Sequence, residues 1–330
     1  MTLYANKFRP MGIGDIFDEV FDLYKHNFVV LAGIGTALFM PVYLALAALS
    51  YSTYAQFGVQ FILLAVVNPF VTTALCFAIS QTFLGRQTTI GKSYRFVGRR
   101  FWQYLGTWTL SILVPVGAMM APGAVGAAIG GVAYLVFHEW WPAAVLGGLG
   151  LMAGIVLAVL MGIWFTFVPA VFAVEGLKYI AALKRSRELV AGHVGRIFAV
   201  LFLVNLLVGI VTFAALMPLG MLSGFETATT GESSPITPIQ NIITGIVTSL
   251  LQPVSLCAIV LLYYDARIRK EGFDLQLLAE ELSAVSAEKS DLYPAGPTPD
   301  ETTGWSSVLG EPPPAPDIDD RIDRPGGAEG

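Results

Sequence analysis

Three carboxylates stand beside basic residues at the ends of long apolar runs: Glu175, Asp265 and Glu271. Carboxylates in that setting could clamp a phospholipid headgroup or an ion, or pair with neighbouring Arg and Lys at the water boundary. We expect the pairing. An enzyme acting on phospholipid headgroups would need an acid, a base and a metal at the interface, and these three groups are its only candidates. We therefore rank that function last.

Basic residues gather in the same places and could bind anionic lipid headgroups. A cation near a negatively charged membrane surface contributes about 1 kcal/mol to binding. The candidate headgroup contacts lie in one connector and directly after the last apolar run: Lys178, Lys184, Arg185, Arg187, Arg267, Arg269 and Lys270. This pattern predicts membrane lipids as partners, through their anionic headgroups at the cytoplasmic face.

Two amide–proline pairs are the sharpest polar features inside the apolar runs, Asn68-Pro69 and Gln252-Pro253. Each proline frees a carbonyl four residues earlier, and the adjacent amide could cap it or contact a ligand at the bundle centre. The alternative, which we favour, is an ordinary kink with interhelical hydrogen bonds. No Asp, Glu, Lys, Arg or His lies near the middle of a predicted span, which disfavours proton- or ion-coupled transport.

Residues that bind metals or act as nucleophiles are sparse. His26 and His193 each precede an apolar run without a third ligand nearby, so we expect interfacial polar residues rather than a metal site. Cys76 and Cys257 lie inside apolar runs and are expected to pack as small hydrophobic side chains. The chain has no GxSxG, Walker or HExxH motif. We therefore predict no catalytic residue, no metal and no cofactor.

The composition is that of a polytopic membrane protein. Of the 330 residues, 55% are hydrophobic and 13% are charged, whereas soluble domains carry about 25% charged residues. The net charge of −5 comes from residues 289–330, which hold nine acids and three bases. Because the rest of the chain is nearly neutral, nucleic acid is not an expected partner.

Six apolar runs are long enough to cross a bilayer, which predicts six transmembrane helices. Their expected bounds are 28–49, 61–84, 101–120, 143–174, 197–217 and 239–264. The fourth run exceeds the ~20 residues that a span needs, so it must tilt, kink near Pro169 or project. Residues 121–137 are apolar but rich in glycine. There we expect a re-entrant hairpin, a broken half-helix or an outer loop rather than a seventh span.

Amphipathic stretches precede the first run, lie between the second and third and between the fourth and fifth, and follow the sixth, whereas an uncharged loop (51–60) joins the first two runs. We therefore expect an all-α fold of three transmembrane hairpins with interfacial helices on the cytoplasmic side. The predicted parts are an N-terminal amphipathic segment (1–27), a six-helix membrane domain (28–264), a C-terminal amphipathic helix (265–288) and a disordered acidic tail (289–330). Segments 12–84, 85–174 and 175–264 each consist of an amphipathic stretch followed by a hairpin. They could be repeats or arise without duplication.

The positions of the basic residues orient the chain in the membrane. All 19 Lys and Arg lie before the first run, between the second and third, between the fourth and fifth, after the sixth, or in the tail. Positively charged segments stay in the cytoplasm, and an even number of spans places both termini on one side. We expect a multi-pass protein of the bacterial inner membrane with cytoplasmic N and C termini.

Three stretches carry a family resemblance: IGDIFDEVFDLYKHNF, EGLKYIAALKRSRELVAGHVGRIF and LLYYDARIRKEGFDLQLLAEEL. Over about residues 10–285 the chain resembles bacterial proteins named for the membrane domain of glycerophosphoryl diester phosphodiesterase, a group that overlaps the YciC-like membrane proteins. The resemblance implies a six-helix membrane domain, sometimes fused to a soluble catalytic barrel. The His-Arg-Gly and Glu-x-Asn motifs of that barrel are not in this sequence, so its activity and catalytic residues are not carried over.

The sequence therefore favours a non-enzymatic membrane protein that organises lipid or a protein partner at the cytoplasmic face, with the acidic tail as a docking segment for such a partner. The alternative is a carrier or channel-like translocator of a small or lipidic molecule. That alternative predicts a polar cavity between the second, fourth and sixth helices, where Asn68 and Gln252 would meet.

Overall fold

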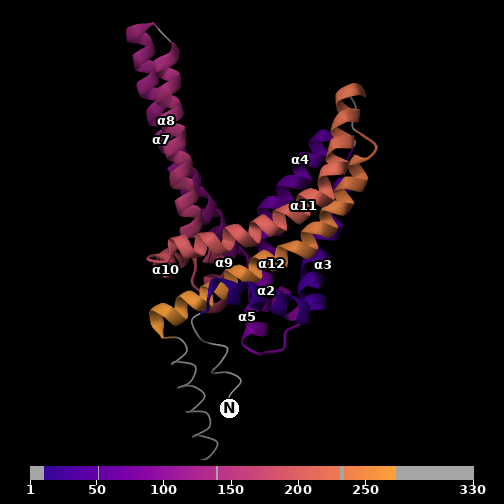
Figure 1. Cartoon of the computed structure of the whole chain (residues 1–330). Coiled ribbons are helices and arrows are strands. Elements are labelled where there is room, and N and C mark those ends of the chain that lie inside the picture. The colour runs from indigo at the N-terminus through magenta and orange to yellow at the C-terminus, as the bar shows by residue number, and fades with distance from the viewer. Residues whose placement is uncertain (1–10, 51, 139, 231–233, 273–330) are drawn as a thin grey trace, which may run out of the picture. The chain divides into compact units, whose positions relative to one another are not determined.

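The computed structural model describes residues 11–50, 52–138, 140–230 and 234–272 (Figure 1). Contacts within the chain divide it at residue 275, and everything described belongs to the first unit. The predicted acidic tail and residues 273–288 of the predicted C-terminal helix lie outside the described residues. Every regular element in the described part is a helix, so the all-α prediction is confirmed there.

The elements follow one another with short connections. The described elements are, in chain order, α2 (Ile13–His26), α3 (Phe28–Ala48), α4 (Thr53–Ile62), a π-helical turn (Leu63–Val67), α5 (Asn68–Phe83), α6 (Ile90–Gly98), α7 (Phe101–Phe137), α8 (Trp140–Trp164), α9 (Val168–Glu175), α10 (Tyr179–Val190), α11 (Val194–Thr230) and α12 (Thr237–Glu271). Six segments of the described chain are long and apolar enough to cross a membrane, by length and composition. These segments indicate a multi-pass membrane protein.

Several bounds differ from the prediction. The uncharged stretch expected as a loop before residue 61 is helix α4, which runs through the π-helical turn into α5. Helix α11 continues past residue 217 to Thr230. No boundary falls at residue 265, because α12 is unbroken to Glu271 and ends where Gly272 takes a left-handed conformation with φ 58°. The fourth run does break near Pro169, where residues 165–167 separate α8 from α9.

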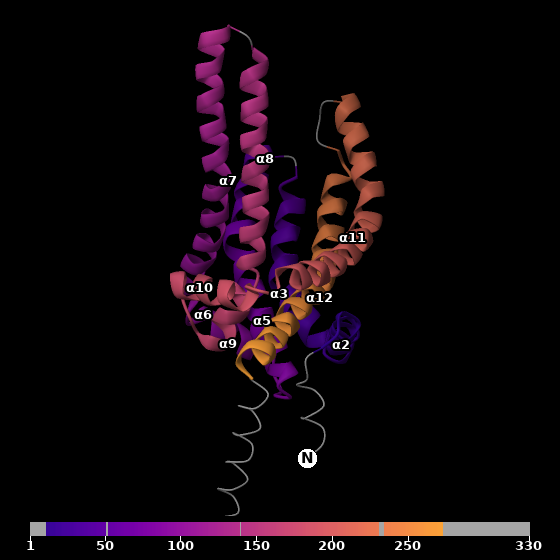
Figure 2. The same ribbon diagram turned by 60° about the vertical axis from the view of Figure 1, so that its left-hand side comes forward.

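The expectation of a separate segment at 121–137 is wrong, since α7 is one helix from Phe101 to Phe137. The glycines there serve packing. A Cβ on Gly126 would lie 2.5 Å from the carbonyl oxygen of Leu146, and one on Gly154 would lie 2.2 Å from that of Met119. Glycine therefore lets the backbones of α7 and α8 touch along their length, as in small-residue packing of membrane helices (Figure 2).

Helix α12 is central to the packing. It contacts α2, α3, α5, α9, α10 and α11, and its longest interface is with α3. At that interface a Cβ on Gly35 would lie 2.9 Å from the carbonyl oxygen of Ser249, and one on Gly245 would lie 2.8 Å from the Tyr43 side chain. The C-terminal half of α12 is buried almost without interruption from Pro253 to Ile268. Its position fixes where the charged residues after Tyr263 stand.

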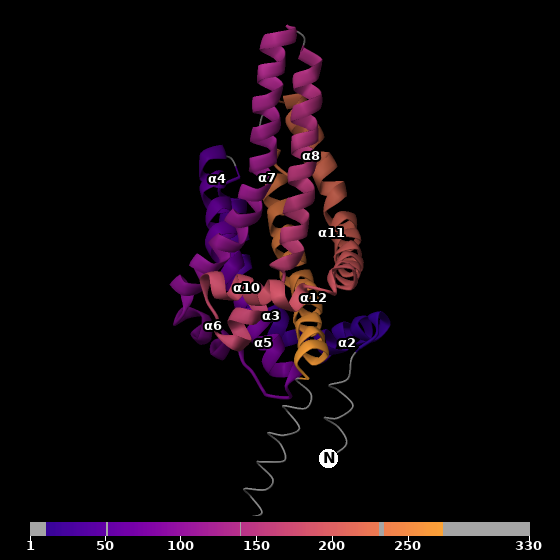
Figure 3. The ribbon, with the colours of Figure 1, turned by 90° about the vertical axis from the view of Figure 1, so that its left-hand side faces the viewer.

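Helices α2, α6, α9 and α10 and the C-terminal end of α12 lie at one end of the long helices (Figures 2 and 3). We call this end the base. Each of the three short helices that precede an odd-numbered long helix buries one face against the long helices. The buried side chains are Ile16, Val20 and Leu23 in α2, Ser93 and Val97 in α6, and Ala182, Leu183, Leu189 and Val190 in α10.

Candidate functional site

The base holds two clusters of ion pairs, and helix ends position both. Helix α9 ends because Gly176 adopts a left-handed conformation with φ 70°, which leaves Glu175 on the last turn. Arg267 and Glu271 stand one turn apart at the end of α12. Arg185 lies in the middle of α10, and its side chain reaches between Glu175 and Glu271.

The first cluster joins α9, α10 and α12. Arg185 Nε donates to Glu175 Oε2 at 2.8 Å, and its Nη1 lies 2.5 Å from Glu271 Oε1. Arg267 Nε donates to Glu271 Oε2 at 3.1 Å, and the Tyr263 hydroxyl donates to Glu175 Oε1 at 2.7 Å. The hydrogen bond to Glu271, and then the one to Glu175, raise the pKa of the Arg185 guanidinium. The four charged side chains are only 14–23% exposed, which strengthens their attraction.

The second cluster surrounds the buried carboxylate of Asp265, whose side chain is 4% exposed. Its oxygens accept from the backbone N–H of Met11 at 3.0 Å and from Arg269 Nε at 2.9 Å. Arg196 Nη2 lies 3.4 Å away and also donates to the Met11 carbonyl. A buried carboxylate requires such partners, and these tie the start of α2 and the start of α11 to α12.

Two further contacts fasten α10. Lys270 Nζ donates to the carbonyls of Glu188 and Ala191 at the end of α10, where a cation is favourable. Ser186 Oγ donates to the carbonyl of Trp164 at 2.6 Å and accepts from the N–H of Phe167 at 3.2 Å. Ser186 therefore satisfies backbone groups that the break between α8 and α9 would leave unpaired.

The structure thus separates the predicted headgroup contacts into two groups. Arg185, Arg267, Arg269 and Lys270 are engaged by carboxylates or carbonyls of the chain itself. Lys184 and Arg187 are exposed and Lys178 is half-buried. None of these three forms an ion pair within the described residues, although the Arg187 guanidinium lies 4.7 Å from the centre of the Trp164 ring.

Helix α6 and its junctions carry a further set of cations that the sequence-based list of contacts left out. Its members are all exposed: Arg86, Lys92, Arg95, Arg99 and Arg100. No Asp or Glu occurs in the sequence between Asp22 and Glu139, and no described carboxylate pairs with any member of the set. The long acid-free interval is the sequence signal that could have identified them.

The two intramembrane amides meet, as the translocator hypothesis required. Gln252 Nε2 donates to Thr72 Oγ1 at 3.2 Å and lies 3.5 Å from Asn68 Oδ1, which also accepts from Thr72 Oγ1 at 3.1 Å. Gln252 Oε1 is buried and has no partner in the described chain. The group links α5 to α12 beside Pro69 and Pro253, with interhelical hydrogen bonds as in the alternative that we favoured.

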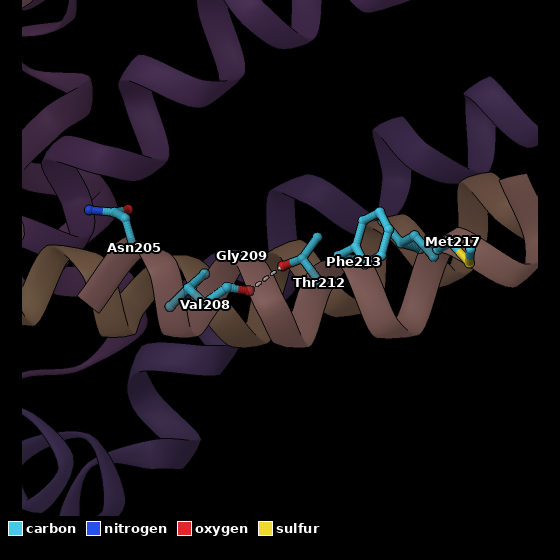
Figure 4. A pocket seen from close by; sticks show the side chains of 7 residues that line it. Asn205, Val208, Gly209, Thr212, Phe213 and Met217 are labelled. Atoms are coloured by element: carbon cyan, nitrogen blue, oxygen red, sulfur yellow. Dashed lines mark hydrogen bonds between the residues drawn. The ribbon is translucent and has the colours of Figure 1, made fainter. Parts of the chain in front are cut away.

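An open groove of about 580 Å³ runs along α11, away from these clusters. Figure 4 shows the side chains that line it, all from α11: Asn205, Val208, Gly209, Thr212, Phe213, Leu216 and Met217. The Asn205 amide is already engaged, because its oxygen accepts from Ser255 Oγ at 3.2 Å and its nitrogen donates to the Leu201 carbonyl. No feature of the sequence indicated this groove.

The described part of the chain contains no assembled site for metal binding or for thiol chemistry. No group of three or more His, Cys, Asp or Glu there could hold a metal ion. His26 contacts Asp22 at 3.3 Å on the exposed side of α2. Cys76 and Cys257 are both buried and free.

Comparison with known proteins adds no relative: no family model matches the chain, and no curated protein or solved structure is significantly similar to it.

Proposed function

We propose that this protein is a non-enzymatic membrane module that organises lipid at one membrane face, with the base of the helices as its working surface. The observation that carries the proposal is the division of the charged residues. Glu175, Asp265 and Glu271 are held by arginines of the chain, which fastens the short helices of the base to α12. The cations of α6, and Lys184 and Arg187 of α10, are left exposed.

The orientation belongs to the same proposal. The basic segments support a base on the cytoplasmic side of the bacterial inner membrane, with both termini there. A base on the cytoplasmic side requires three hairpins with interfacial amphipathic helices. Close packing of α7 with α8 and of α11 with α12 supports it, as does the burial of one face of α2, α6 and α10. Membership of the phosphodiesterase membrane-domain family remains a prediction. Docking of a protein partner on the acidic tail is the second form of the proposal.

Native mass spectrometry of the protein extracted together with its own lipids tests the lipid-organising function. The proposal expects phospholipid to stay bound through detergent exchange, and delipidated protein to take it up again from added phospholipid. A protein that stays lipid-free under both conditions would refute the proposal. Co-purification of a stoichiometric protein, lost when residues 289–330 are removed, would favour the partner-binding form.

A translocator is the second candidate function. Asn68, Thr72 and Gln252 meet inside the apolar segments, and the observation that favours a ligand there over interhelical bonding alone is the buried Gln252 Oε1, which has no partner in the described chain. A conducting path would expose these groups to water in at least one state. The test is labelling of a Gln252→Cys variant, with Cys76 and Cys257 replaced by Ala, using a membrane-impermeant thiol reagent in proteoliposomes. Rapid labelling supports a path. A thiol that reacts only after the membrane is dissolved supports static interhelical bonding instead.

A further inference from the structure

Helix α6 presents three cations from one fixed face. Lys92, Arg95 and Arg99 follow the i, i+3, i+7 spacing that aligns side chains along one side of a helix. Ser93 and Val97 lie about 100–140° around the helix from Lys92 and are fully buried. The cationic stripe and the buried stripe therefore occupy different faces, and the cationic one is exposed.

The helix is held firmly against α3 and α5. The Phe96 ring stacks on that of Phe77 with centroids 4.2 Å apart and an interplanar angle of 13°. The hydroxyl of Tyr94 donates to the Ile34 carbonyl in α3. Anchored in this way, α6 offers its cations at fixed positions, so binding an anion costs little ordering of the backbone.

The charge of this face is uncompensated, unlike that of α10 and α12. The α12 arginines pair with carboxylates, and the exposed cations of α10 share their helix with Glu188. Around α6 the nearest acids in sequence are Asp22 and Glu139. Trp102, 78% exposed on the first turn of α7, follows Arg100 by two residues. Exposed Trp next to cations is typical of the headgroup depth of a membrane.

We propose that α6 and the first turn of α7 form a binding surface for the phosphate groups of anionic phospholipids, with Lys92, Arg95 and Arg99 as the principal contacts. This inference rests on the proposed function and names its site and its lipid class. The positive charge of this surface favours the binding of anionic over zwitterionic lipid, because a zwitterion presents no net charge to an uncompensated cationic face. Arginine and lysine donors suit phosphate oxygens, which arginine binds in a bidentate manner.

The test is titration of delipidated full-length protein with phosphatidylglycerol, or with phosphatidylcholine of the same acyl chains, followed by native mass spectrometry. A triple variant, Lys92→Gln with Arg95→Gln and Arg99→Gln, removes the stripe. A matched triple, Lys178→Gln with Lys184→Gln and Arg187→Gln, removes the same charge from α10. The charge-conserving triple Lys92→Arg with Arg95→Lys and Arg99→Lys controls for folding, together with the unfolding temperature of each protein.

We expect the α6 triple to bind phosphatidylglycerol about 100-fold more weakly, from three contacts of about 1 kcal/mol each. Phosphatidylcholine binding should not change, and the α10 triple should lose less than tenfold. The charge-conserving triple should bind as the wild type does. Equal losses in the α6 and α10 triples, or unchanged binding in the α6 triple, would overturn the inference and leave the proposed function standing. A wild-type protein that binds neither lipid would overturn both.

Discussion

Replacing Arg185 by Met is the sharpest perturbation of the base, because that side chain joins Glu175 on α9 to Glu271 on α12. The substitution keeps an unbranched apolar stem and removes three charge-assisted hydrogen-bond contacts. Such bonds contribute about 1.5–3 kcal/mol each. Breaking a buried pair by removing one partner costs about 3–5 kcal/mol. Because the Arg185 side chain is 23% exposed, the expected loss is at the lower end, about 3 kcal/mol.

The assay is unfolding of the purified protein in one detergent, followed by tryptophan fluorescence, with Lys184→Met as the matched control. Lys184 is the preceding residue of α10, is exposed and forms no ion pair in the described chain, so its replacement should change the unfolding free energy by less than about 0.5 kcal/mol. Adding Glu271→Gln to Arg185→Met should recover part of the loss, because Arg185→Met leaves the two carboxylates Glu175 and Glu271 with Arg267 alone among the described cations, and the second change removes the excess negative charge. If Arg185→Met matched Lys184→Met, the cluster would contribute nothing and the reasoning would fail.

Three further substitutions test the packing. Gly150→Val should separate α7 from α8 and lower the free energy of unfolding by more than about 2 kcal/mol. Gly148→Val meets open space and should change it by less than about 0.5 kcal/mol, because valine is a slightly better helix former than glycine; hydrogen exchange along the two helices distinguishes the variants. Ser186→Ala should lower the free energy of unfolding by about 1–3 kcal/mol, because it leaves two backbone groups at the α8–α9 break unpaired. Thermal unfolding measures the change, and a loss below about 0.5 kcal/mol would contradict the role of Ser186. Gln252→Leu should lower the free energy of unfolding by about 0.6–1.7 kcal/mol. The double variant with Thr72→Val should lose less than the sum of the two single losses, and strict additivity would contradict the hydrogen bond between Gln252 and Thr72.

The charge pattern predicted the pairing of the carboxylates but not their partners. A carboxylate beside several Lys and Arg residues at a membrane boundary has more than one possible partner, so Glu175, Asp265 and Glu271 were expected to form ion pairs. Which cation each one binds depends on how α10 packs against α12. Glu175 and Tyr263 lie 88 residues apart in the chain. Local spacing cannot encode such a contact. The structure was therefore needed to show that Arg185, Arg267 and Arg269 are engaged within the chain, whereas the acid-free interval around α6 could be read from the sequence.

Glycine explains the principal error in the fold. In residues 121–137 it indicated a break, since glycine destabilises a helix by about 1 kcal/mol relative to alanine. The neighbouring helix α8 reverses that inference. Gly150 faces Pro122 and Gly126 of α7, and Gly154 faces Met119, so the missing Cβ atoms allow contact between backbones. A single helical segment does not reveal its partner, and the uncharged residues of α4 were assigned to a loop for the same reason.

A structure of the full-length protein in nanodiscs with phosphatidylglycerol would locate the lipid phosphates relative to α6. We expect phosphate density within about 3–4 Å of the basic groups of Lys92, Arg95 and Arg99, with Arg185 still bound to Glu175 and Glu271. Phosphates seated on Arg185 and Arg267, with their ion pairs opened, would contradict this expectation, as would lipid density absent from α6.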